Sequence, residues 1–157
     1  MKNKQVLFFA STLLLVLALV FWFIQPAIVG TGLLENLEIS FVDATFGKTD
    51  SWGPISLTSL KFSILNLIPF LLLLFALGLS LLKAFGIKLL ASTGFEDMLI
   101  IVFALVAGVG LLLAPQLTTM TNEALENINL NLGLGAILAG SLTLVSALLA
   151  VVSKFLK

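Results

Sequence analysis

Long apolar runs dominate the chain, and polar residues gather in the segments between them. Four runs approach the roughly 20 residues that an α-helix needs to cross about 30 Å of hydrocarbon. They cover residues 6–24, 62–82, 98–114 and 130–152. Uninterrupted runs of this length favour helices over the alternating pattern of membrane β-strands. The pattern therefore predicts an all-α integral membrane protein, a bundle of four transmembrane helices formed by one domain, 1–157.

Composition and charge support this interpretation. Apolar residues make up 60% of the chain and charged residues 10%, whereas soluble domains are about 45–50% apolar and 25% charged. The eight Lys and the eight Asp or Glu all lie outside the apolar runs. Because an ionised side chain at a helix centre costs about 2.5–3.5 kcal/mol on the insertion scale, this exclusion supports the span boundaries.

The lysines predict the orientation, since positive residues accumulate on the cytoplasmic side of a membrane. Only Lys48 and Lys61 lie in the outer segments 25–61 and 115–129. The others lie at the chain ends or in the inner segment 83–97, and they are Lys2, Lys4, Lys83, Lys88, Lys154 and Lys157. We therefore expect a multi-pass plasma-membrane protein with both termini cytoplasmic (N-in/C-in) and a long first extracytoplasmic loop.

The outer segments have room for short elements. The pattern over 33–39 suits a short helix on the membrane surface, whereas β-forming residues over 39–46, followed by a possible turn at 47–50, suit a hairpin. Before the last span, residues 121–131 could extend that helix into water, although alternating apolar residues also fit a strand. We prefer the helix.

One flank of the last span carries small residues at alternating spacings of three and four. They are Gly133, Ala136, Gly140, Thr143, Ala147 and Ala150. The third span has a looser version that includes Ala104 and Gly108. In lipid, small residues let two helices bring their backbones close together. We expect these two faces to pack on each other within one subunit; the alternative is that one of them contacts another subunit or lines a pore.

The first span lacks such a face, and its leucines and phenylalanines suit contact with lipid. We expect Phe21, Trp22 and Phe23 to lie in the aromatic belt at the outer membrane interface. In the second span, Asn66 needs a polar partner away from lipid. It either bonds a neighbouring helix or the Leu65 carbonyl that Pro69 frees, or it binds a solute. We count it as a possible polar site together with Glu123 and Glu126 in the second outer segment.

Several kinds of chemistry lack their usual residues. The chain has no Cys, His, Arg or Tyr, which removes disulfides, cysteine or histidine catalysis and the common zinc and haem ligands. A basic stripe for nucleic acid is also missing. We therefore expect no enzymatic activity, no cofactor, no metal and no nucleic-acid partner.

Two functions remain. The first is a structural or accessory membrane subunit that packs through its small-residue faces. It would present the first outer loop to a partner, with Phe41, Phe46 and Trp52 as contact residues. The alternative is a homo-oligomeric channel for ions or small solutes, lined by Thr143 and Ser146 or by Asn66, with Glu123 or Glu126 at its mouth. The expected partners are the lipid bilayer and other membrane subunits or further copies of the chain.

Overall fold

A computed structural model describes residues 2–31, 37–52, 55–87, 93–118 and 129–155. In chain order its elements are α1 (Lys2–Ile24), β1 (Pro26–Thr31), β2 (Leu37–Ser40), α2 (Phe41–Phe46), β3 (Lys48–Trp52), β4 (Ile55–Leu60), α3 (Ile64–Ala84), α4 (Thr93–Leu112), α5 (Ala114–Leu117), β5 (Asn129–Leu132) and α6 (Leu134–Phe155).

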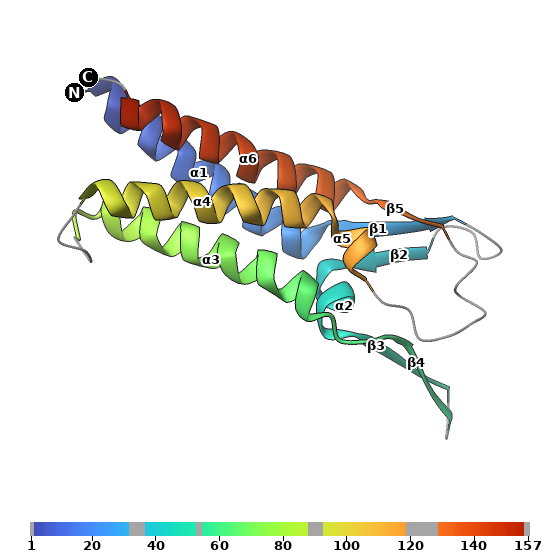
Figure 1. The fold of residues 1–157 in the computed structure, drawn as a ribbon. Helices are drawn as coiled ribbons and strands as arrows, with labels where there is room; N and C mark the ends of the chain where they lie inside the picture. The colour runs from blue at the N-terminus through green and yellow to red at the C-terminus, as the bar shows by residue number, and fades with distance from the viewer. Residues whose placement is uncertain (1, 32–36, 53–54, 88–92, 119–128, 156–157) are drawn as a thin grey trace.

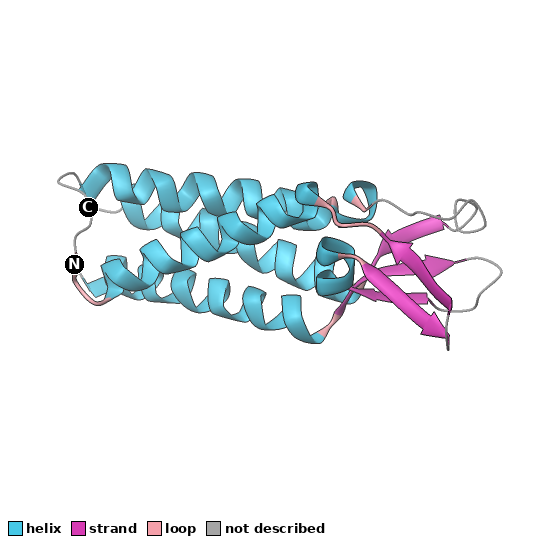
Figure 2. Ribbon diagram, turned by 90° about the horizontal axis from the view of Figure 1, so that it is seen from below, coloured by secondary structure: helices cyan, strands magenta, loops and turns pink. Residues whose placement is uncertain are grey.

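The long helices α1, α3, α4 and α6 pack side by side as a bundle (Figure 1). Within the described residues, these four are long and apolar enough to cross a membrane, by length and composition. Helix α6 packs against both α1 and α4, and α4 packs against α3. Both chain termini lie at one end of the bundle, which we call the terminal end. The strands lie at the other end, which we call the strand end (Figure 2).

The predicted bundle is therefore confirmed, with shifted boundaries. Helix α4 begins five residues before the predicted third span, because Glu96 and its neighbours form its first turn. Acidic side chains are favourable there, beside the positive end of the helix dipole. Helix α6 begins at Leu134 instead of residue 130, because the residues before it form a strand.

The expectation of an all-α fold is wrong at the strand end. A sheet with the order β2-β1-β5 is antiparallel throughout, pairing Val29 with both Glu38 and Asn131. Strand β1 follows α1 after Gln25, and β5 precedes α6 by Gly133. Two helices from opposite ends of the chain are thus joined through their adjoining strands.

The short elements of the outer segments also differ from the prediction. Residues 37–39 belong to a strand instead of a surface helix, and residues 129–131 form a strand where we preferred a helix. Residues 41–46 form a helix, because the Ser40 hydroxyl accepts a hydrogen bond from the Asp43 amide and caps it. The hairpin lies further along the chain, where β3 pairs with β4.

Helix α1 contributes one face to the core, while bulky side chains such as Phe9 and Leu13 stay exposed, as expected for contact with lipid. Its buried residues recur at spacings of three and four, and they include Ser11, Leu15, Ala18 and Trp22. The Trp22 ring stacks on Phe70 of α3 at 4.1 Å and on Phe41 of α2 at 5.4 Å between ring centroids. Trp22 therefore fills the strand end of the core instead of joining an outer aromatic belt.

The outward faces of the long helices are apolar. Exposed side chains there include Phe75, Val106 and Leu148. In water, these side chains would need a partner surface to cover them. In a bilayer, the hydrocarbon of the lipids covers them directly. The apolar helices thus indicate contact with a lipid bilayer.

Candidate functional site

The small residues of α6 lie inside the bundle. All six residues of the predicted flank are buried, from Gly133, which immediately precedes the helix, to Ala150. Gly135, Ala139, Ser146 and Ser153 are buried as well. Because the small surface covers about half of the helix, it serves two neighbours at once, α4 on one side and α1 on the other.

Toward α4 the contact is reciprocal. A Cβ atom added to Gly140 would lie 2.6 Å from Leu112 Cγ of α4, and one added to Gly108 would lie 2.7 Å from Leu144 Cγ of α6. Each leucine follows the glycine of its own helix by four residues. Each glycine also has the backbone oxygen of the other glycine 3.1 Å from its added Cβ. Ala104, the remaining predicted residue of α4, is buried too.

Toward α1 the contact adds hydrogen bonds. Ser11 Oγ donates to the Ser146 backbone oxygen at 3.0 Å, and Ser146 Oγ donates to the Ser11 backbone oxygen at 2.9 Å. Further toward the strand end, a Cβ at Gly133 would lie 2.4 Å from the Pro26 backbone oxygen. A Cβ at Gly135 would lie 2.6 Å from the Gln25 backbone oxygen. Glycine at these positions lets the end of α1 and the start of β1 touch α6.

The hydroxyl groups proposed for a pore are engaged within the chain. Thr143 Oγ1 donates to the Ala139 backbone oxygen at 2.6 Å, and Ser146 bonds Ser11 as described above. Both residues are buried. A channel lined by these hydroxyls would therefore require the helices to rearrange.

Asn66 connects three segments at the strand end. Its amide nitrogen donates to the Ala44 backbone oxygen of α2 at 3.0 Å and to Thr118 Oγ1, just after α5, at 2.8 Å. The neighbouring Ser63 hydroxyl donates to the Leu117 backbone oxygen at 2.7 Å. Asn66 is 4% exposed. Between the two roles considered for it, this geometry favours a bond between elements over solute binding.

At the terminal end, polar contacts join α1, α3 and α4. The Thr12 hydroxyl of α1 lies 2.7 Å from the Ser80 hydroxyl of α3. Lys83 of α3 forms an ion pair with Asp97 of α4, and its Nζ lies 4.9 Å from the centre of the Phe8 ring. Sequence analysis did not single out these contacts. The available signal for the hydroxyl contact was the pair of hydroxyls at positions 11 and 12 within the otherwise apolar run 6–24.

The predicted contact residues of the outer loop have different environments. Phe46 is 52% exposed, whereas Phe41 is 2% exposed and stacks on Trp22. The expectation that Phe41 is exposed is therefore wrong, because it belongs to the core. Trp52 ends β3, but its side chain lies outside the described residues, as do Glu123 and Glu126.

Other features of the described residues bear on chemistry. No group of three or more His, Cys, Asp or Glu side chains that could hold a metal ion occurs among them. Within the same part of the chain, the buried Thr45 hydroxyl and the Trp22 ring nitrogen have no hydrogen-bond partner. The feature of the strand end that bears on binding is the backbone of its strands. Strands β3 and β4 form a sheet of their own, separate from the sheet of β2, β1 and β5.

Comparisons with known protein families, with curated proteins and with solved structures gave no match. The function is therefore inferred from the geometry of this chain.

Proposed function

We propose that the protein is a non-enzymatic accessory membrane subunit, anchored by its helix bundle, that presents its strand end to a partner protein. The observation that carries the proposal is the β3–β4 hairpin. It extends away from the bundle beyond α2 and forms its own sheet (Figure 1). An isolated two-stranded hairpin is only marginally stable in water. A partner that packs on it or extends it would therefore stabilise it.

The hairpin suits pairing with an extended segment. Its strands pair from Lys48 with Leu60 to Trp52 with Ile55, and the register shifts between Lys48 and Thr49. Exposed strand edges carry backbone groups that a further strand can bond, and recognition by strand addition works in this way. The main chain would then supply most of the affinity.

The helices are less suited to recruiting a partner. The small-residue faces that would let another helix approach are occupied by α1 and α4 of the same chain, through contacts such as Gly108 with Gly140. The remaining outward faces carry bulky side chains, which suit lipid. This distribution supports the strand end as the surface for association.

We infer that the terminal end faces the cytoplasm of a plasma membrane. Six of the eight lysines lie near the chain ends, in the last turn of α3 or between α3 and α4, and both termini lie at that end. Because the chain has no cysteine, single-cysteine variants give a clean test. A membrane-impermeant maleimide should label Thr49→Cys in intact cells but label Gln5→Cys only after permeabilisation. The opposite pattern would reverse the orientation.

Site-specific crosslinking tests the partner. A photoreactive residue at the exposed Thr49 position should yield one crosslinked partner, whereas the same residue at Phe95, exposed at the other end, should not. The matched variant replaces residues 51–56 with Asn-Gly, which keeps the Asp50–Leu57 pair and closes a two-residue turn. The helix bundle of this shortened variant should unfold at the same temperature as that of the wild type, while the crosslink from position 49 disappears.

Two results would contradict the proposal. One is a crosslink that survives shortening of the hairpin. The other is recovery of crosslinks only to further copies of this chain, which would favour the homo-oligomeric alternative.

A further inference from the structure

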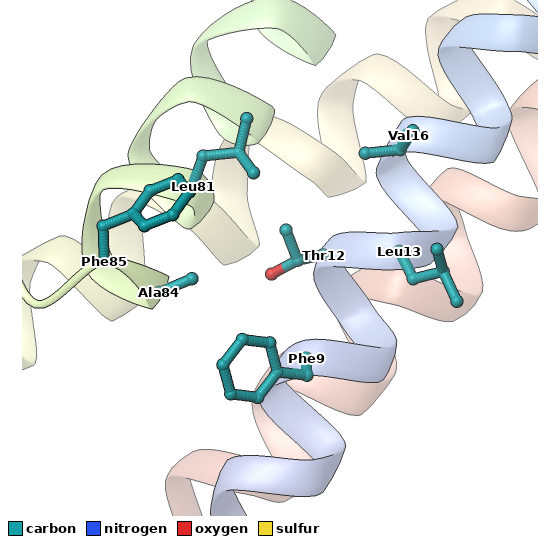
Figure 3. Close-up of a pocket in the computed structure, with 7 residues that line it drawn as sticks. All are labelled: Phe9, Thr12, Leu13, Val16, Leu81, Ala84 and Phe85. Carbon is teal, nitrogen blue, oxygen red and sulfur yellow. The ribbon is translucent and has the colours of Figure 1, made fainter.

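A groove separates α1 from α3 near the terminal end. The hydrogen bond between Thr12 and Ser80 joins these helices. Beside it lies a cavity of about 390 Å³, open along one side. Its walls are Phe9, Leu13 and Val16 from α1 and Leu81, Ala84 and Phe85 from α3, and Figure 3 shows them on opposite sides of the Thr12 hydroxyl. The volume falls within the range of about 300–1,000 Å³ that is typical of small-molecule sites.

The lining calls for an apolar occupant. The hydroxyl group in the lining belongs to Thr12. It already lies within hydrogen-bond distance of the Ser80 hydroxyl and of the Phe8 backbone oxygen. The wall side chains are hydrocarbon, and several are more than half exposed, with Phe9 at 57%, Leu13 at 59% and Phe85 at 79%. Nothing in the lining requires a polar ligand atom.

A lipid acyl chain fits these walls better than a partner helix does. Helices that associate in membranes use small residues so that their backbones approach closely. Here five of the seven lining residues are bulky, namely two phenylalanines, two leucines and a valine, and the other two are Thr12 and Ala84. A helix with its side chains is about 10–12 Å across, and these bulky walls would hold its backbone away. A single flexible hydrocarbon chain can instead lie between them.

The positive charge near the groove favours a lipid with an anionic head group. The groove lies at the terminal end, where α1 begins with Lys2 and Lys4 and where α3 ends with Lys83. Lys83 keeps 29% of its side chain exposed although it pairs with Asp97. Basic positions between transmembrane helices on the cytoplasmic side attract anionic lipid head groups. We propose that an anionic phospholipid seats one acyl chain in the α1–α3 groove and places its phosphate beside Lys83. This site does not depend on the proposed partner of the strand end.

Native mass spectrometry of the full-length protein tests the acyl-chain seat. The probes are dioleoyl phosphatidylglycerol, which is anionic, and dioleoyl phosphatidylcholine, which is zwitterionic and has the same chains. We expect the wild type to retain phosphatidylglycerol at least tenfold more tightly than phosphatidylcholine. Filling the groove from either wall, with Ala84→Trp or Val16→Trp, should weaken that binding about tenfold. The control Leu148→Trp, on the exposed face of α6, should leave it unchanged.

A matched pair of variants tests the head group. Lys83→Gln removes both the ion pair and the positive charge, whereas Asp97→Asn removes the ion pair and keeps the positive charge of Lys83. We expect Lys83→Gln to weaken phosphatidylglycerol binding several-fold and Asp97→Asn to maintain or strengthen it. Equal retention of the two lipids by the wild type would overturn the proposal. So would tight phosphatidylglycerol binding by both groove-filling variants, or equal effects of Lys83→Gln and Asp97→Asn.

Discussion

The reciprocal contact between α4 and α6 leads to a quantitative prediction for Gly140→Ala. The added Cβ would lie 2.6 Å from Leu112 Cγ, whereas carbon atoms in good contact lie about 3.5–4.0 Å apart. The leucine or the helix must therefore move by about 1 Å. Overpacking of this kind costs about 1–3 kcal/mol. Alanine also favours the helix by about 0.5–1 kcal/mol relative to glycine, which offsets part of the cost.

Gly78→Ala is the matched control. Gly78 lies within α3, and a Cβ added there would meet no atom within 4 Å. Both variants gain the same helix propensity, so the difference between them isolates the packing term. We expect Gly140→Ala to be less stable than Gly78→Ala by about 1–3 kcal/mol.

A second variant makes the test specific to the contact. In a Leu112→Ala background the obstructing side chain is gone, so Gly140→Ala should cost much less there than in the wild type. The assay is reversible unfolding in mixed micelles, followed by helicity, for the complete double-mutant cycle. If Gly140→Ala matched Gly78→Ala in both backgrounds, the close approach of α4 and α6 would be wrong.

Four further predictions use the same unfolding assay. Gly110→Ala should be more damaging than Gly140→Ala, because its Cβ would lie 2.3 Å from the Pro69 ring, which cannot rotate away as a leucine can. A double-mutant cycle of Ser11→Ala and Ser146→Ala should give a coupling energy of about 0.6–1.7 kcal/mol, as measured for hydrogen bonds between membrane helices. A coupling energy of zero would show that these hydrogen bonds do not stabilise the contact between α1 and α6. Asn66→Leu should cost about 1–3 kcal/mol, because it takes the donor away from the buried Ala44 oxygen, and a neutral result would contradict the bond. Thr45→Val should stabilise the protein by about 1 kcal/mol, because its buried hydroxyl lacks a partner among the described residues, and a loss of stability would reveal one.

The bundle could be predicted because its signals are long and repetitive. Hydrocarbon excludes charge over some 20 consecutive residues, so each span leaves an unambiguous apolar run. The small flank of α6 was equally visible, since its six residues follow regular alternating spacings of three and four. The pattern also suggested α4 as a neighbour of this flank, but it did not reveal α1 as the second neighbour. Ser11 and Ala18 marked a buried face of α1, but leucine and phenylalanine around them obscured it.

The strand end was harder to predict because its elements are short and their partners are distant. Strand β1 pairs with β5 about 100 residues later in the chain, and no local pattern encodes that pairing. Residues 41–46 contain β-forming side chains, yet the Ser40 cap and the burial of Phe41 against Trp22 stabilise a helix there. Tertiary contacts thus overrode a weak local preference.

The pairing of α1 with α6 has a consequence for biogenesis. Roughly 110 residues separate the end of α1 from the start of α6, since 134 minus 24 is 110. At about 5–20 residues per second, the ribosome needs roughly 6–20 s to make them. During that interval the first helix sits in the membrane with Ser11 lacking the partner that it will later bond. Insertion of this chain therefore includes an interval in which an insertase or chaperone that shelters this lone helix and its Ser11 hydroxyl would improve the yield of folded protein.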